Sequence, residues 1–369
     1  MESKSNMKWV WIIVVVVVAL GGWMFVKKST VQTPTKPLKV GVILPLTGSV
    51  AVSGEKLLQG VQLAQKEVDS AKITFVIEDD HSKTADGITA AKKLMEVDKV
   101  DVLLGLYIPD VVVAVAPLAK EKGITIFSAS YCSDAFKNLD NVFCGYPTAI
   151  DQLRTVLPEI NKENIKKVAL VNTNDDFGIN SRDGMVTLAS EGGYEVVFNE
   201  LVPFESRDLK TQVAKVIASK ADAVFMASGD TAQAFTLMKL LKEQGYKGMR
   251  ITFVDINKKA LADFKGNVEG TFAPGMAPSE FSSDFTQKYK TAYGKAPEDY
   301  VVALGYDIAK EATSIMQSRG FDSTKFVSQA ISYKYSNPAI KNFGYKSDRS
   351  INFALELWTV KDGDYIKVK

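Results

Sequence analysis

Two successive series of strand-like and helix-like segments limit the fold more than any other feature of the chain. Short apolar runs rich in β-branched residues alternate with stretches whose apolar side chains recur at helical spacing. The first series has strands at residues 38–45, 73–77, 102–106 and 124–128 and helices at 55–70, 85–96 and 111–122. The second has strands at 168–172, 195–201, 223–227 and 251–254 and helices at 181–191, 209–219 and 231–243. This alternation predicts a parallel sheet with helices on both faces in each series, so we expect two doubly wound α/β units.

The rest of the folded part adds to these two units. Their boundary falls near residues 147–152, and helices at 279–293 and 300–317 precede a strand-rich end at 353–368. A length of 369 residues exceeds one ordinary domain and suits two.

The composition argues against several classes of site. The net charge is +2 and no basic cluster is interleaved with aromatics, so nucleic acid is not an expected partner. One histidine and two cysteines are too few for a metal site of the usual Cys/His kind. A catalytic triad would have to use His81, which follows Asp79 and Asp80 with no nucleophile motif nearby. We therefore interpret His81 as a polar loop residue and expect no metal, no cofactor and no catalysis.

Residues 9–26 form an uncharged apolar run with tryptophans near both ends. At ~1.5 Å per residue, a helix of this length spans about 27 Å, close to the thickness of a bilayer's hydrocarbon core. A cleaved signal peptide with a site at Ala19-Leu20-Gly21 is the alternative. Because the run stays apolar as far as Val26, we favour an uncleaved transmembrane anchor. Residues 1–8 are then a short cytoplasmic tail, and residues 27–37 a linker.

Ligands in open parallel sheets bind outside the carboxyl ends of the strands, which makes the loops there the candidate site. These loops are rich in Ser, Thr, Asn, Asp and Gly and lie at residues 46–54, 79–85, 107–110, 129–134, 173–180, 228–231 and 255–258. Their acids Asp110, Asp230 and Asp255, together with the lack of arginine, favour a neutral or cationic solute over a dianion. The chain has no GxGxxG, GxxxxGKS/T or GxSxG motif, which argues against nucleotide-dependent enzymes and α/β hydrolases.

The start of the folded part, KVGVILPLTGSVAVSGEKLLQGVQLA, resembles the opening of the leucine/isoleucine/valine-type periplasmic binding proteins. In that family a strand runs through a P-x-(S/T)-G loop to a helix with Gly-x-x-x-Ala. The likeness continues through IEDDHSKTADGITAAKKL, VDVLLGLY, GITIFSAS, NTNDDFG and ADAVFMASG. It covers essentially all of residues 38–369.

The resemblance implies a type I periplasmic binding protein whose two lobes are joined by a three-strand hinge, with crossings near Pro147, Gly275 and Phe353. Lobe 1 then comprises residues 38–148 and 276–353, and lobe 2 residues 149–275 and 354–369. Such proteins close around a small-molecule solute and deliver it to an ABC permease driven by a separate ATPase. We expect an extracytoplasmic binding domain tethered to the cell membrane.

The lobe 1 site residues of the family transfer unevenly onto this sequence. The serine that holds an amino-acid carboxylate is replaced by Pro109, with Asp110 next to it. The positions after the fourth strand are Ser130 and Cys132, and Ser53 replaces the aromatic of the first loop. The missing carboxylate-holding pair argues against a free α-amino acid as ligand.

The remaining matches give one acid and an aromatic wall. Asp255 matches the acid of the second lobe that holds the ammonium group of the ligand. Phe177 and Tyr300, or less closely Tyr306, match the aromatic walls of the cleft. Tyr107, at the end of its strand, completes the predicted ligand-binding set.

Each of these residues also has a purely structural interpretation. Asp255 and Asp110 are each placed to cap a following helix. Phe177 and Tyr107 are equally compatible with places in the core.

Cys132 and Cys144 are the two cysteines of the chain. In an oxidising compartment they are close enough in sequence to pair, and a loop this short would gain roughly 3 kcal/mol. Two buried free thiols are the alternative, and sequence does not decide between them.

Three functions follow from these observations. We favour a transport-associated solute-binding protein for an amino acid, amide or related amine. A ligand-sensing ectodomain that signals to a separate membrane partner is the alternative. An α/β enzyme is disfavoured by the missing motifs.

Overall fold

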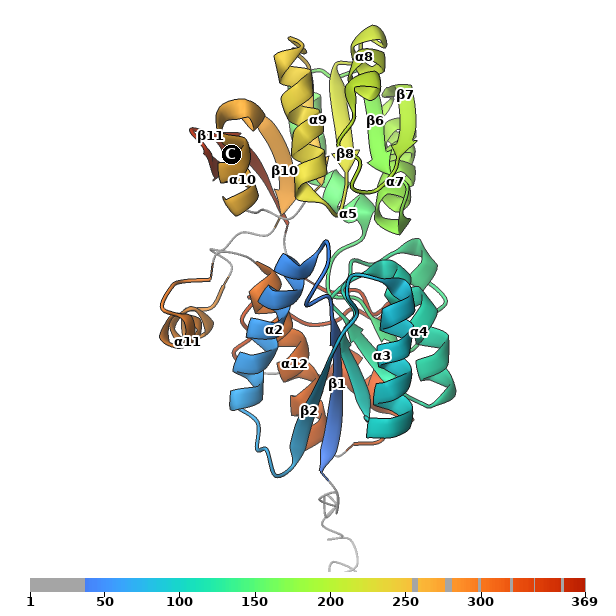
Figure 1. Cartoon of the computed structure of the whole chain (residues 1–369), viewed down its shortest axis with the longest axis vertical. Coiled ribbons are helices and arrows are strands. Elements are labelled where there is room, and N and C mark those ends of the chain that lie inside the picture. The colour runs from blue at the N-terminus through green and yellow to red at the C-terminus, as the bar shows by residue number, and fades with distance from the viewer. Residues whose placement is uncertain are drawn as a thin grey trace, which may run out of the picture.

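The computed structural model describes residues 37–253, 258–275, 281–297, 300–318, 321–334, 336–352 and 355–368. Figure 1 shows two α/β bodies stacked along the long axis, which we call lobe 1 (built on β1–β5) and lobe 2 (built on β6–β12). The predicted membrane helix at 9–26 lies outside these residues. Within them, no helix is both long and apolar enough to cross a membrane.

Lobe 1 contains a parallel sheet of order β2-β1-β3-β4-β5. Its strands are β1 (Leu38–Leu44), β2 (Ile73–Asp79), β3 (Val102–Gly105), β4 (Thr125–Ser128) and β5 (Val142–Phe143). Its helices are α2 (Ala51–Lys66), α3 (Thr84–Lys93), α4 (Pro109–Glu121), α11 (Ser283–Tyr293), α12 (Tyr300–Ser318) and α13 (Phe326–Ser332), with short turns η1 (Leu94–Asp98) and η2 (Asp134–Phe136).

The two faces of this sheet are buried in separate cores. Val40, Val42 and Leu44 of β1 pack on the side of α2 and α12, whereas Ile43 packs on the side of α3 and α4. This alternation along β1 is the period-2 pattern of a strand buried on both faces.

Lobe 2 contains a larger sheet of order β12-β11-β10-β9-β8-β6-β7. Its strands are β6 (Lys167–Thr173), β7 (Glu195–Val202), β8 (Ala223–Ala227), β9 (Met249–Phe253), β10 (Thr271–Gly275), β11 (Glu356–Lys361) and β12 (Asp364–Lys367). Its helices are α5 (Ala149–Arg154), α6 (Leu157–Lys162), α7 (Asp176–Gly192), α8 (Lys210–Ala218), α9 (Thr231–Glu243) and α10 (Lys258–Phe264), with the turn η3 (Lys265–Val268). Strands β6 to β10 are parallel to one another, and the hairpin β11–β12 adds two antiparallel strands at one edge of the sheet.

The structure confirms the two predicted α/β units with parallel sheets. Helix α9 has the predicted bounds, but α2 and α7 each begin several residues before the predicted start. Strand β10, the two-residue strand β5 and the helices α5, α6, α10 and α13 were not predicted. The short elements lack the length that gives a periodic pattern.

Candidate ligand-binding site

A cavity of about 340 Å³ lies between the two lobes at the carboxyl ends of their parallel strands. Lobe 1 lines it with Ser49, Val50, Ser82, Thr84, Tyr107, Ile108, Pro109, Asp110, Ala129, Ser130, Tyr131, Tyr146 and Tyr300. Lobe 2 lines it with Gln152, Asp175, Phe177, Phe204, Ser228 and Gly229. Six of the seven loops predicted from the sheet rule contribute to this wall, and most of the seventh, at 255–258, lies outside the described residues.

Five of the predicted site residues meet on this wall: Tyr107, Asp110, Ser130, Phe177 and Tyr300. Asp255 lies outside the described residues. Ser53 and Cys132 are not among the described lining residues. Ser53 belongs to α2, which starts at Ala51, so the preceding residues Ser49 and Val50 reach the cavity instead.

Asp110 lies in the first turn of α4, but it does not cap that helix. The cap position is Ile108, and the helix begins at Pro109. The helix-cap interpretation of Asp110 is therefore wrong. Its carboxylate makes no hydrogen bond or ion pair with a described residue. Desolvation in the cleft, and then the charges of Asp176 and Asp175 on the other lobe, raise the pKa of Asp110.

The start of α7 carries the lobe 2 side of the site. Asp175 caps this helix, because its Oδ1 accepts hydrogen bonds from the Gly178 amide and the Thr173 hydroxyl, each at 2.8 Å. The cap fixes the following Phe177, whose ring packs edge-on against Tyr131 of lobe 1 with centroids 5.0 Å apart. Phe177 thus contacts the cores of both lobes and also lines the cavity.

A set of hydrogen bonds joins the lobes beside the cavity. The Tyr131 hydroxyl donates to the Asp176 carboxylate. The Asp134 amide donates to Asn180 Oδ1 at 3.0 Å, and Asn180 Nδ2 lies 3.4 Å from the Ser133 hydroxyl. Burial and the charge of Asp176 raise the pKa of Tyr131, so its hydroxyl stays a donor.

The segment that carries Tyr131 and Ser133 is fastened by a disulfide. Cys132 and Cys144 are joined in the structure, with Cα atoms 5.2 Å apart, which is the first of the two alternatives that the sequence left open. The Cys132 side chain packs in the lobe 1 core, so it has no free thiol to offer a ligand. Ser130, nearby in the same segment, is 2% exposed, and its hydroxyl has no hydrogen-bond partner in the described part of the chain.

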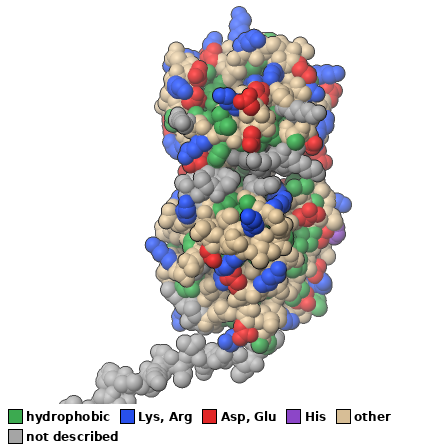
Figure 2. All heavy atoms as spheres, turned by 90° about the vertical axis from the view of Figure 1, so that its left-hand side faces the viewer, with side chains coloured by type: hydrophobic (Ala, Val, Ile, Leu, Met, Phe, Trp, Pro, Cys, Tyr) green, Lys and Arg blue, Asp and Glu red, His purple; other side chains and the backbone are tan. Residues whose placement is uncertain are grey.

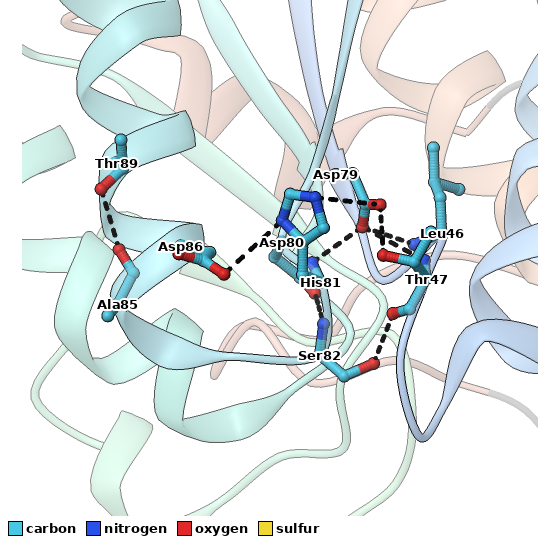
Figure 3. Close-up of polar contacts among 9 residues, drawn as sticks. All are labelled: Leu46, Thr47, Asp79, Asp80, His81, Ser82, Ala85, Asp86 and Thr89. Atoms are coloured by element: carbon cyan, nitrogen blue, oxygen red, sulfur yellow. Dashed lines mark hydrogen bonds and ion pairs between the residues drawn. The ribbon is translucent and has the colours of Figure 1, made fainter.

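The loop at 79–82 is hydrogen-bonded to the loop at 46–54, and both loops contribute to the wall of the cavity (Figure 3). Asp79 Oδ1 accepts the Leu46 amide at 2.9 Å and the His81 amide at 2.8 Å. Ser82 donates its hydroxyl to the Thr47 carbonyl at 2.8 Å, which ties this loop to the one that carries Ser49. Although burial opposes the shift, the hydrogen bonds from Thr47 and these amides lower the pKa of Asp79.

His81 lies in the same loop, between two carboxylates. Its ring nitrogens are each 3.6 Å from a carboxylate oxygen, Nε2 from Asp79 and Nδ1 from Asp86 (Figure 3). In the described part of the chain, no group of three His, Cys, Asp or Glu side chains is placed to hold a metal ion.

Aromatic rings form much of the remaining wall. Tyr146 and Tyr300 lie with ring centroids 4.7 Å apart, and Phe204 enters from the loop after β7. Tyr131, Tyr146, Phe204 and Gln152 were not predicted, and only Tyr131 lies in a predicted loop. Tyr306 is buried, with its hydroxyl 2.9 Å from Glu67, so this alternative to Tyr300 is wrong.

The charge on the wall is negative. Asp110 and Asp175 are its charged side chains, and no Lys or Arg is among the described lining residues. Asp230, another predicted acid, instead caps α9 and pairs with Arg207. Elsewhere, on the face shown in Figure 2, basic and acidic side chains are interspersed over both lobes.

Comparison with known proteins agrees with this architecture. The family model described as periplasmic binding protein matches residues 37–364. A Leu/Ile/Val-binding protein homolog 1 of Brucella melitensis is 26% identical over 311 residues, which cover 80% of this chain and 82% of that protein.

Solved structures have the same fold. A leucine-binding protein from Thermotoga maritima superposes with a TM-score of 0.80 at 19% identity, covering 90% of this chain and 98% of that one. A solute-binding protein of an ABC transporter from Rhodopseudomonas palustris, in complex with 4-hydroxybenzoate, gives 0.79 at 20% identity, covering 90% and 96%. Because the family model matches most of this chain, the chain belongs to the periplasmic binding protein family.

Proposed function

We propose that this protein is an extracytoplasmic solute-binding protein that captures a small polar solute, such as an amino acid, amide or related amine, and delivers it to an ABC importer. One observation carries the proposal: a single cavity is lined by residues of both lobes at the carboxyl ends of both sheets. A solute held there contacts both lobes at once, so its binding energy favours the closed arrangement. Closure is the change that a permease and its ATPase partner would recognise.

The proposed contacts come from the predicted residues that reach the wall. Tyr107, Phe177 and Tyr300 supply aromatic surface for the body of the solute. Asp110 and Ser130 supply a carboxylate and a hydroxyl that have no partner among the described residues. Asp255 stays a predicted contact of the second lobe. This combination of an apolar lining and a few polar groups is typical of small-molecule sites.

A thermal-shift screen of the full-length protein tests the function. A panel of amino acids, amides, polyamines and sugars should contain a compound that raises the melting temperature. At about 100 times its dissociation constant such a compound stabilises by ~2.7 kcal/mol. Tyr107→Ala should weaken the effect, whereas Tyr333→Ala, an aromatic of lobe 1 outside the cavity lining, should not. If no compound stabilises the protein, or if both variants respond equally, the proposed site is refuted.

We also propose that residues 9–26 tether the protein to the membrane. The expressed protein should then sediment with membranes and keep residues 1–26. Mass spectrometry that finds a mature chain beginning at Gly22 would instead establish a cleaved signal peptide.

A further inference from the structure

Two carboxylates face the cavity from opposite lobes. Asp110 belongs to the first turn of α4 in lobe 1, and Asp175 precedes α7 in lobe 2. Asp175 uses its Oδ1 to cap its helix, whereas Asp110 is bonded to no described residue. One negative group on each side of the cleft is therefore available to a solute.

We expect these like charges on opposite lobes to oppose closure of an empty cleft. Burial, and then the charges of Asp176 and Asp175 on the other lobe, raise the pKa of Asp110. No Lys or Arg of the described lining offsets them. Bringing like charges together in a partly dry cleft costs free energy unless a cation lies between them.

A separate group points to a ligand at the same wall. The Ser130 hydroxyl is buried, lines the cavity and has no hydrogen-bond partner among the residues that the structure describes. Buried hydroxyls are normally paired, so the partner of Ser130 is expected to come from the solute. A cationic nitrogen with an adjacent polar group would satisfy both the carboxylates and this hydroxyl.

We infer that the solute carries a cationic group that lies between Asp110 of lobe 1 and Asp175 of lobe 2, and that Asp110 is a specificity-determining residue of the cleft. This inference rests on the proposed function. The cation removes the repulsion between the lobes and forms charge-assisted hydrogen bonds with both. A carboxylate ligand, such as the 4-hydroxybenzoate bound by the Rhodopseudomonas palustris protein, would instead meet two carboxylates. The charge of the preferred solute therefore distinguishes the cleft of this protein from that of the Rhodopseudomonas palustris protein.

Titration calorimetry of the full-length protein near pH 7 tests the inference with probes matched in shape. The pairs are benzylamine against benzoate, and L-phenylalaninamide against N-acetyl-L-phenylalanine. At least one amine should bind, and more tightly than its acid counterpart. Asp110→Asn should weaken that amine by about 10- to 100-fold, the loss of one charge-assisted contact. It should also reduce the preference for the amine over the acid.

Glu121→Gln is the matched control, because Glu121 is an exposed acid of the same helix outside the cavity lining. It should leave the affinity for the amine unchanged. Asp175→Asn should weaken the amine while keeping the helix cap, since Asn caps about as well as Asp. Equal melting temperatures of the unliganded variants would show that folding is intact.

Three results would overturn the inference. They are an acid that binds as tightly as its amine, an amine whose affinity is unchanged by Asp110→Asn, and no binding of either amine. If the thermal-shift panel still yields a neutral solute, the proposed function stands and only the inference fails. If that panel is empty as well, the proposed function fails with it.

Discussion

The two lobes are built alike but bury different charges. In each, an aspartate that precedes a central strand holds the start of the neighbouring strand. Asp101 accepts the Lys39 amide at 2.7 Å in lobe 1, and Asp222 accepts the Lys167 amide at 2.8 Å in lobe 2. In each, a glycine lets the helix after the first strand approach that strand. A Cβ atom on Gly54 or on Gly178 would lie 2.0 Å from a backbone oxygen.

The difference lies in the buried acids. Lobe 1 buries Asp80, Asp307 and Glu311 completely. Asp307 accepts the amides of Ala339 and Ile340, each at 2.7 Å, but neither carboxyl oxygen of Glu311 has a hydrogen-bond partner within the described segments. In the described part of lobe 2 the buried acid is Glu159, which pairs with Lys162 at 3.1 Å. The same architecture therefore gives lobe 1 a dependence on pH that these contacts of lobe 2 do not supply.

Glu311 is expected to produce the largest effect. Burial, and then the charge of Asp307, raise the pKa of Glu311 to about 8 from its ordinary value of 4.5. Between these values the folded lobe holds a proton that the unfolded chain releases, so stability falls as pH rises from about 4.5 to about 8. Over the whole window the loss is on the order of 5 kcal/mol. Glu311→Gln should remove the part of that slope that comes from Glu311, because Gln does not titrate.

Denaturant unfolding of residues 37–369 at pH 5, 7 and 9 measures this slope. In that segment Trp358 of β11 is the sole tryptophan, so its fluorescence reports lobe 2 while circular dichroism reports both lobes. The buried amide of Glu311→Gln lowers the free energy of unfolding by the same amount at each pH. The two proteins are therefore compared by the slope of stability against pH and not by their absolute stability. A wild-type protein whose lobe 1 is equally stable at pH 5 and pH 9 would contradict the expectation.

Asp80, whose pKa is raised to about 6 by burial, adds to the slope below neutral pH.

The disulfide is the next largest asymmetry between the lobes. Cys132 and Cys144, 12 residues apart, are both in lobe 1. Replacing both with Ser should destabilise lobe 1 by about 3 kcal/mol and leave the Trp358 transition of lobe 2 in place. The same measurement after reduction of the wild-type protein is the control. A loss shared equally by both lobes would show that they unfold as one unit.

The strand-holding aspartates should give the smallest effect, and one that is similar in the two lobes. Asp222→Ala removes an acceptor shared by the Lys166 and Lys167 amides, and Asp101→Ala removes the acceptor of Lys39. Each should cost its own lobe about 1.5 kcal/mol, since these are charge-assisted hydrogen bonds near solvent. The Asn variants keep an acceptor and should cost less. A loss of stability from Asp222→Ala but not from Asp101→Ala would mean that the strand-holding aspartate stabilises lobe 2 only.

Periodicity predicted the layered fold because strands and helices of ordinary length leave clear patterns. The predicted starts of helices are wrong where contacts with other parts of the fold determine the first residue of the helix. Gly54 was assigned to a loop, yet α2 includes it, because the helix needs a residue without a Cβ where it passes Pro45. Helix α7 begins at Asp176, since the side chain of Asp175 caps it earlier than the apolar pattern indicated.

The site was predictable where it depends on the sheet and not where it depends on the approach of the lobes. The rule for parallel strands placed Tyr107, Asp110, Ser130 and Phe177 in loops that line the cavity. Gln152 and Phe204 reach the cavity from α5 and from an edge-strand loop, which no local pattern marks. The contacts between Tyr131 and lobe 2 likewise depend on how the two lobes meet.

Hydrogen exchange tests the central claim, that a solute binds between the lobes, most directly. It compares the free protein with the protein saturated by the panel compound that stabilises it most. We predict slower exchange on both sides of the cavity, in residues 107–112 of lobe 1 and in residues 175–180 of lobe 2. Protection confined to one lobe, or located around the surface pocket near Lys120 and Asp140, would contradict capture between the lobes.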